Sequence, residues 1–155
     1  MPRFQDIETK VATLISTHGV DVLRIALATV FLWFGALKIV GMSPVYGLIS
    51  AAVPWVPPEF FVPALGVWEI AIGIGLLTAR ALRVTLTLFF LQMAGTFLVL
   101  FIRPDLAFQH GNPIMLTAEG EFVIKNLVFI SAGAVVGSAM HGRKKRARET
   151  TNAST

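Results

Sequence analysis

Hydrophobic residues are concentrated in four long stretches of this chain, separated by charged or Pro- and Gly-rich connections. The stretches cover residues 22–40, 60–79, 84–102 and 122–140, and the third contains no charged residue. A helix rises about 1.5 Å per residue, so about 20 apolar residues cross the roughly 30 Å hydrocarbon core of a bilayer. The pattern predicts an all-α fold, with four membrane-spanning helices bundled in residues 21–141.

Residues 1–20, before the first stretch, also show helical periodicity. Apolar side chains recur there at helical spacing, with polar residues between them: Phe4, Ile7, Val11, Leu14 and Ile15. This predicts a short interfacial helix on the cytoplasmic membrane surface that ends near Gly19. The alternative is an anchor helix packed against the bundle.

The connection between the first two stretches contains a further helix signal. Ser43 and Pro44 suit the N-cap and first turn of a helix over residues 45–53, which is followed by a Pro-rich segment. We expect a short interfacial helix there. Tyr46 and Trp55 suit the headgroup region, so no ligand is needed to explain them.

Composition supports a membrane protein. The 155 residues are 55% hydrophobic and 14% charged, which leaves too little polar surface for a soluble globule. The chain has no cysteine, so it forms no disulfide and offers no thiolate nucleophile or cysteine metal ligand. Any redox role must therefore use a bound molecule or a partner.

Most basic residues lie on one side of the predicted spans, and only Lys38, Arg103 and Lys125 lie on the other. The positive-inside rule therefore places both termini in the cytoplasm. Residues 142–155 are basic and then polar, which predicts a disordered cytoplasmic tail. Directly after a span, its basic cluster is expected to contact anionic headgroups rather than nucleic acid. The predicted membrane-surface residues are Arg24, Arg143, Lys144, Lys145 and Arg146.

Ionisable side chains inside the spans are the strongest functional candidates, because a charge at a helix centre costs about 2.5–3.5 kcal/mol on insertion scales. Glu69 lies too deep in the second span for its short side chain to reach the outer surface easily. Gly66 and Gly73 share its helix face and would let another helix approach.

Polar residues of the other spans can meet Glu69 in the outer half of the bundle. The predicted polar cluster is Lys38, Glu69, Gln92, Lys125 and Asn126. Lys125 also has a local partner in Glu121 at i, i+4, a pair that stabilises a helix only slightly. Two interpretations stay open: the cluster fixes helix register, or it binds a ligand or proton.

The positions of the histidines limit which cofactors the spans can bind. All three histidines lie outside them, so no intramembrane pair can hold a haem, and residues 103–121 resemble a solvated loop more than a metal site. No cofactor or metal is expected, although a quinone is compatible. Its pocket would lie near Trp33, Phe34 and Trp68, with Lys38, Glu69 or Gln92 binding its carbonyl oxygens.

Three segments together resemble the DoxX-like family of small four-span membrane proteins. They are VLRIALATVFLWFGALKIVG, GVWEIAIGIGLL and GEFVIKNLVFISAGAVV, and the resemblance covers roughly residues 21–140. The first segment and the later Ser43-Pro44 are similar to the branch that contains the inner-membrane protein for resistance to reactive chlorine. The resemblance implies a bacterial inner-membrane protein linked to oxidative or thiol stress and to membrane oxidoreductase assemblies.

Two classes of function compete. We favour a noncatalytic accessory or anchoring subunit in redox defence, whose partner is a membrane or soluble oxidoreductase, because inverted repeats and broken helices are not evident. The alternative is a small-molecule or proton transporter, or a quinone-binding oxidoreductase subunit that uses Lys38, Glu69 and Lys125. A sealed Lys38, Glu69 and Lys125 network would favour the structural role, and a cavity that opens outward would favour passage or binding. The sequence leaves open whether the chain forms a homo-oligomer.

Overall fold

The computed structural model describes the backbone of residues 2–152 and the side chains of residues 6–140 and 142. Its four long helices are α1 (Pro2–Ile39), α3 (Pro58–Thr78), α4 (Leu82–Ile102) and α6 (Ala118–Asn152). Each contains a segment that is long and apolar enough to cross a membrane, and no strand is assigned within residues 2–152. The predicted all-α fold and its four spans are confirmed.

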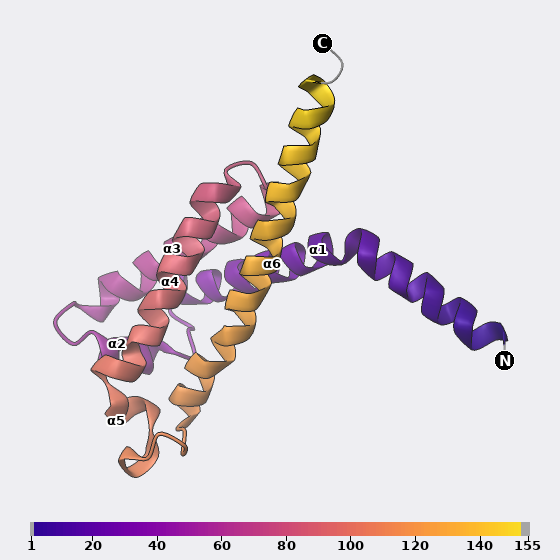
Figure 1. Ribbon diagram of the computed structural model, residues 1–155. Coiled ribbons are helices and arrows are strands. Elements are labelled where there is room, and N and C mark those ends of the chain that lie inside the picture. Colours follow the sequence, from indigo (N-terminus) through magenta and orange to yellow (C-terminus); the bar gives the residue numbers. More distant parts are fainter. Residues whose placement is uncertain (1, 153–155) are drawn as a thin grey trace.

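Three short elements lie in the connections: α2 (Tyr46–Ala52), α5 (Pro104–Ala107) and the 3-10 helix η1 (Gln109–Gly111). Figure 1 shows α2 and α5 at the end of the bundle away from both chain termini. α2 confirms the helix expected over residues 45–53, but Ser43 does not cap it. The helix follows Val45 without a side-chain capping bond, and the buried Ser43 hydroxyl has no hydrogen-bond partner in the described part of the chain.

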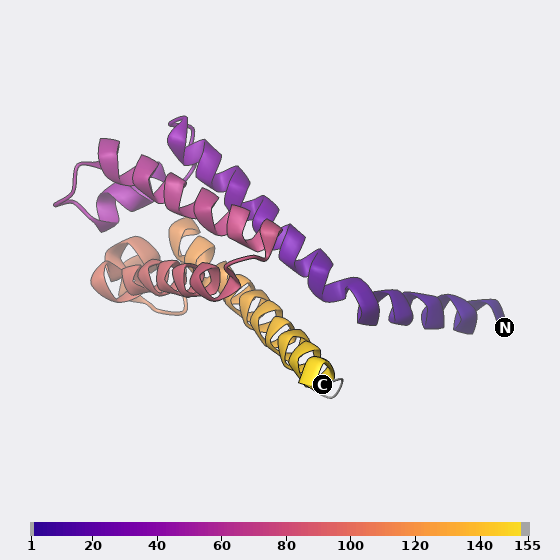
Figure 2. The ribbon, with the colours of Figure 1, turned by 90° about the horizontal axis from the view of Figure 1, so that it is seen from above.

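The long helices form two layers (Figure 2). α1 packs along α3 in one layer, while α4 contacts α6 in the other and α6 also touches α1. Buried side chains from all four helices form one apolar core, toward the α3–α4 turn: Leu27, Ala28, Phe31, Ile72, Leu76, Leu82, Phe89, Met93, Ala132 and Val136. The core thus fills one half of the bundle, and the other half lies beside α2.

The predicted end of the N-terminal helix is wrong. α1 does not end near Gly19 but continues unbroken to Ile39, and its first part projects away from the bundle (Figure 1). The anchor-helix alternative also fails, because residues 6–18 are exposed. An existing helix extends through one glycine at about 1 kcal/mol, with no new nucleation cost.

The segment 142–152, expected to be disordered, is helical, since α6 runs to Asn152. Lys, Arg, Ala and Glu are good helix formers, so they prolong a helix that the span has already nucleated. The side chains of Arg143, Lys144, Lys145 and Arg146 lie outside the described residues. Their headgroup contacts stay a prediction.

Large apolar side chains cover the outside of the bundle. Trp33, Val67, Phe101 and Val128 are among many that are exposed. On a soluble protein, so much exposed apolar surface would indicate an interaction site. On a membrane protein, the surface that faces the lipid chains has to be apolar. The exposed residues therefore agree with the four spans.

Candidate functional site

A cavity of about 740 Å³ occupies the half of the bundle beside α2, opposite the apolar core. All four long helices and α2 contribute to its walls, which are mostly apolar. Its aromatic lining residues are Phe31, Phe34, Trp55, Phe61, Trp68, Phe122 and Phe129. The volume lies within the range of roughly 300–1,000 Å³ that is usual for small-molecule sites.

One part of the wall is polar and joins three helices. Lys38 Nζ on α1 donates to both carboxylate oxygens of Glu69 on α3, at 2.9 Å from Oε1 and 2.7 Å from Oε2. Gln92 Nε2 on α4 donates to Glu69 Oε1 at 2.7 Å. The ion pair is largely buried, with 6% of the Lys38 side chain and 10% of the Glu69 side chain exposed. All three hydrogen bonds end on Glu69 oxygens, so together they stabilise the carboxylate form.

Two glycines bring Lys38 and Glu69 together. Gly35 and Gly66 each precede one partner of the pair by three residues, so they lie on the same helix faces. A Cβ atom on Gly35 would lie 2.7 Å from the carbonyl oxygen of Gly66, and one on Gly66 would lie 2.7 Å from the carbonyl oxygen of Gly35. Only glycine at both positions lets the backbones of α1 and α3 approach this closely.

Lys125 and Asn126 line the cavity but do not join this network. Lys125 pairs with Glu121 at 3.3 Å, and its side chain is 70% exposed. The buried Asn126 donates from Nδ2 to the Phe122 carbonyl at 3.0 Å, within its own helix. The expected pair of lysines around Glu69 is therefore corrected to Lys38 alone. The local i, i+4 partner and the position near a helix end keep the Lys125 ammonium outside the cluster.

Of the three aromatic residues expected near a quinone, Phe34 and Trp68 line the cavity. Trp33 does not, because it is 68% exposed on the outer surface. Neighbouring residues of a helix point about 100° apart, so Trp33 and Phe34 cannot both face inward. Trp68 Nε1 donates to the Leu88 carbonyl at 3.3 Å and so links α3 to α4.

Arg24 binds the end of a neighbouring helix, although it was expected at the membrane surface as a headgroup contact. Its Nη1 donates to the carbonyls of Leu76 and Leu77, the latter at 2.8 Å, where α3 ends. Asp21 lies 3.7 Å from Arg24 Nη2. Because the last carbonyls of a helix lack partners within it, the guanidinium caps α3 and complements its dipole.

Replacing Arg24 with methionine is expected to destabilise the folded chain by about 1.5–3 kcal/mol, the range for hydrogen bonds to a charged group. The matched control is Arg80→Met in the exposed α3–α4 turn, which should change little. Thermal unfolding of both variants in one detergent checks this. Equal midpoints for the two variants would contradict the capping role.

Arg103 is a second residue whose role the sequence did not reveal. Nη1 donates to the Ala51 carbonyl in α2, while Nε and Nη2 donate to the two Asp105 oxygens at 3.0 and 2.7 Å. The guanidinium hydrogen bond lowers the pKa of Asp105 and raises that of Arg103. Since α2 forms one wall of the cavity, Arg103 holds that wall against the end of α4.

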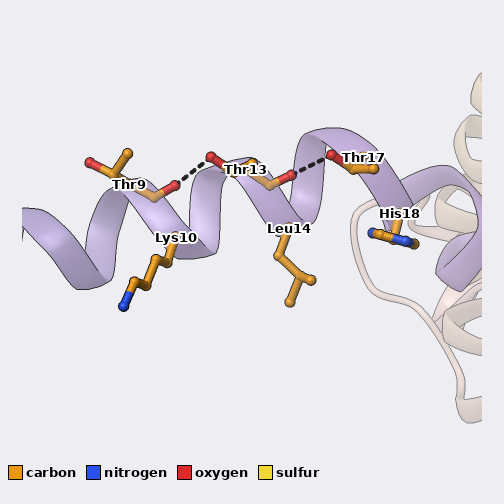
Figure 3. Close-up of a pocket in the computed structure, with 6 residues that line it drawn as sticks. All are labelled: Thr9, Lys10, Thr13, Leu14, Thr17 and His18. Atoms are coloured by element: carbon orange, nitrogen blue, oxygen red, sulfur yellow. Dashed lines mark hydrogen bonds between the residues drawn. The ribbon is translucent and has the colours of Figure 1, made fainter.

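A second hollow, of about 290 Å³, lies along the N-terminal part of α1 (Figure 3). Thr13 and Thr17 donate their hydroxyl protons to the carbonyls of Thr9 and Thr13, each at 2.8 Å, so these hydroxyl donors serve their own helix. Every lining residue comes from this one helix. Nothing encloses a ligand there, and we do not treat it as a site.

The described part of the chain contains no group of three or more His, Asp or Glu side chains that could hold a metal ion. Comparisons with protein-family models, curated proteins and solved structures find no match. The chemistry of the cavity follows from its own residues: it is partly open, mostly apolar and aromatic, and one part of its wall is charged and hydrogen-bonding.

Proposed function

We propose that this chain is a multi-pass protein of the bacterial cytoplasmic membrane that holds a quinone-class molecule in its cavity. In this proposal it serves as a noncatalytic accessory subunit of a redox or oxidative-stress defence system, with both termini in the cytoplasm. The observation that carries the proposal is the cavity of about 740 Å³ with the Lys38–Glu69–Gln92 network in its wall.

The walls match the two parts of such a ligand. A quinone has a flat ring that carries carbonyl oxygens, and an apolar tail. The ring and the tail suit the aromatic lining of the cavity. An ammonium group has three N–H donors, and the two hydrogen bonds from Lys38 to Glu69 leave one for a carbonyl oxygen. The cavity therefore offers a place for both the ring and its oxygens.

The other candidate functions fit the geometry less well. A cluster that only fixed helix register would need no adjoining cavity. A transporter opens its site to each side of the membrane in turn, whereas the tightly packed core around Phe31 and Phe89 closes the cavity toward the α3–α4 turn in this structure. Binding is the role that uses both the cavity and its polar wall.

The test is purification of the chain from bacterial membranes in a mild detergent, followed by extraction and quantification of bound quinone and of copurifying proteins. Gly95→Phe should empty the cavity of ligand, because Gly95 lines it and a Cβ there meets no atom within 4 Å. We expect near-stoichiometric quinone in the wild type and at least tenfold less in Gly95→Phe.

The matched control is Gly47→Phe in α2. Its Cβ also meets no atom within 4 Å, and Gly47 does not line the cavity. Quinone content should stay at the wild-type level in this variant. Equal quinone in both variants, or none above the background of an unrelated membrane protein, would refute the proposed site.

A further inference from the structure

The cavity is open on one flank of the bundle, between α3 and α4. Leu91, Gly95 and Leu98 of α4 line the cavity and are also exposed, as is Ala64 of α3. The two leucines are 58% and 51% exposed, and a Cβ on Gly95 meets no atom within 4 Å. The cavity is therefore not closed here, and we call the gap edged by these four residues the lateral opening.

The directions of side chains on α4 place the lateral opening on the flank away from α6. Gln92 points from α4 to α3, where it donates to Glu69 at 2.7 Å. Leu86 faces α6, because a Cβ on Gly137 would lie 3.1 Å from it. Successive residues of a helix turn by about 100°, so Leu86 lies about 120° from Gln92 on one side and Leu91 about 100° on the other. The lateral opening thus lies beyond the α3 contact, on the outer flank of the bundle.

α3 and α4 contact each other on one side of the lateral opening and separate at it. Toward the α3–α4 turn, a Cβ on Gly75 would collide with the Thr85 side chain, and Trp68 donates to a backbone carbonyl of α4 at 3.3 Å. Beyond Gln92, no hydrogen bond among the described residues joins the two helices. At that end α2 bounds the opening, because Arg103 ties α2 to the end of α4.

The lateral opening faces lipid chains, because it lies within the membrane-spanning parts of both helices. Pro58–Thr78 and Leu82–Ile102 are each long and apolar enough to cross a bilayer. Gly95 follows Gln92 by three residues, which is about 4.5 Å along the helix axis. The opening therefore adjoins the polar wall of the cavity. A molecule dissolved in the bilayer can reach that wall without crossing the headgroup region.

We infer that the ligand is a lipid-tailed quinone of the bilayer, which enters through the lateral opening and leaves its tail there. This rests on the proposed function, which supplies the quinone ring, and it adds that long-tailed members of the class are accepted whatever their tail length. With one ring oxygen at Lys38, a tail on the far side of the ring can pass between Ala64 and Gly95. A tail that stays among lipid chains remains in an apolar medium, so it need not fit the volume of the cavity.

The test compares decyl-ubiquinone with the same dimethoxy-methyl-benzoquinone ring without a tail. Equilibrium binding to the purified full chain is followed by tryptophan fluorescence in a Trp33→Phe background, where both remaining tryptophans, Trp55 and Trp68, line the cavity. Ala64→Phe places a ring in the lateral opening. We expect it to raise the dissociation constant of decyl-ubiquinone at least tenfold and that of the tailless ring less than twofold. Each ratio compares one quinone in one detergent, so its partition into micelles cancels.

Val67→Phe is the matched control, because Val67 belongs to the same helix and is 60% exposed but does not line the cavity. Both dissociation constants should stay unchanged in this variant. An equal effect of Ala64→Phe on the two quinones, or none on decyl-ubiquinone, overturns the inference and leaves the proposed function standing. If neither quinone binds before Ala64 is replaced, the proposed function fails as well.

A second measurement needs no variant. Decyl-ubiquinone with a photoreactive diazirine at the end of its tail is bound to the wild-type chain and illuminated, and the labelled residues are identified by mass spectrometry. We expect labels at the lateral opening, on Ala64, Leu91 or Leu98. Phe122 and Lys125 of α6 are also exposed and line the cavity, so they mark the competing route. Labels on these two residues or on α2 instead overturn the inference even if Ala64→Phe does not fold.

Discussion

Replacing Lys38 with methionine is expected to lower the free energy of unfolding by about 3–5 kcal/mol, because it leaves the Glu69 carboxylate buried without its cation. Insertion scales give a similar cost of about 2.5–3.5 kcal/mol for a charge at a helix centre. Glu69→Met should destabilise comparably by stranding Lys38. Thermal unfolding of each variant in the same detergent measures the effect.

The double variant Lys38→Met/Glu69→Met distinguishes lost charge compensation from lost packing. With neither charge present no buried ion is stranded, so most of the lost stability should return. Lys125→Met is the control, because its exposed pair with Glu121 contributes less than about 1 kcal/mol. The double variant could instead be as unstable as the less stable of the two single variants. That result would show that loss of charge compensation is not the cause of the destabilisation.

Replacing Gly66 with leucine is expected to force α1 and α3 apart and to destabilise the chain by about 3 kcal/mol, the upper part of the range for over-packing. A Cβ at this position would meet the Gly35 carbonyl oxygen at 2.7 Å and the Lys38 Cβ at 3.0 Å. A backbone carbonyl cannot rotate away as a side chain can. The shift should also separate Lys38 from Glu69, so quinone retention should fall together with the unfolding midpoint.

Gly95→Leu is the matched control for the unfolding midpoint alone, because Gly95 lines the cavity and its substitution also affects ligand binding. Gly95 also lies within a membrane-spanning helix, but a Cβ there meets no atom within 4 Å. Leucine should keep or slightly raise stability, because glycine is about 1 kcal/mol less favourable in a helix. If Gly66→Leu kept the wild-type unfolding midpoint, the close contact of α1 and α3 would not be needed for folding.

The core of the polar network was predictable because its cause is local. Glu69 had to avoid lipid, and Gly66 on the same face marked where another helix approaches; in the structure that helix is α1, which carries Lys38. Gln92 is an amide side chain within a predicted span that has no charged residue. Each of these residues stands out from the apolar residues of its own helix, so it can be recognised without knowing which helices pack beside it.

The residues that sequence reasoning misplaced depend on neighbours. Arg24 and Arg103 bind backbone carbonyls of other elements, and carbonyls carry no sequence signal. The antiparallel packing of the first two spans was the one clue that Arg24 lies beside the end of the second. Lys125 had two acidic candidates, and its choice of Glu121 follows from which way α6 is turned.

The sequence alone determined that this protein has four apolar helices with an acidic group buried among them, because hydropathy and the cost of an intramembrane charge act within each segment. The tertiary structure alone decided that the half of the bundle beside α2 is hollow and that Lys38, Glu69 and Gln92 lie together in the wall of this hollow. Cavity volume depends on how far two layers of helices diverge. That separation arises from contacts between residues of the two layers that are far apart in the chain, such as Phe31 of α1 with Phe89 of α4.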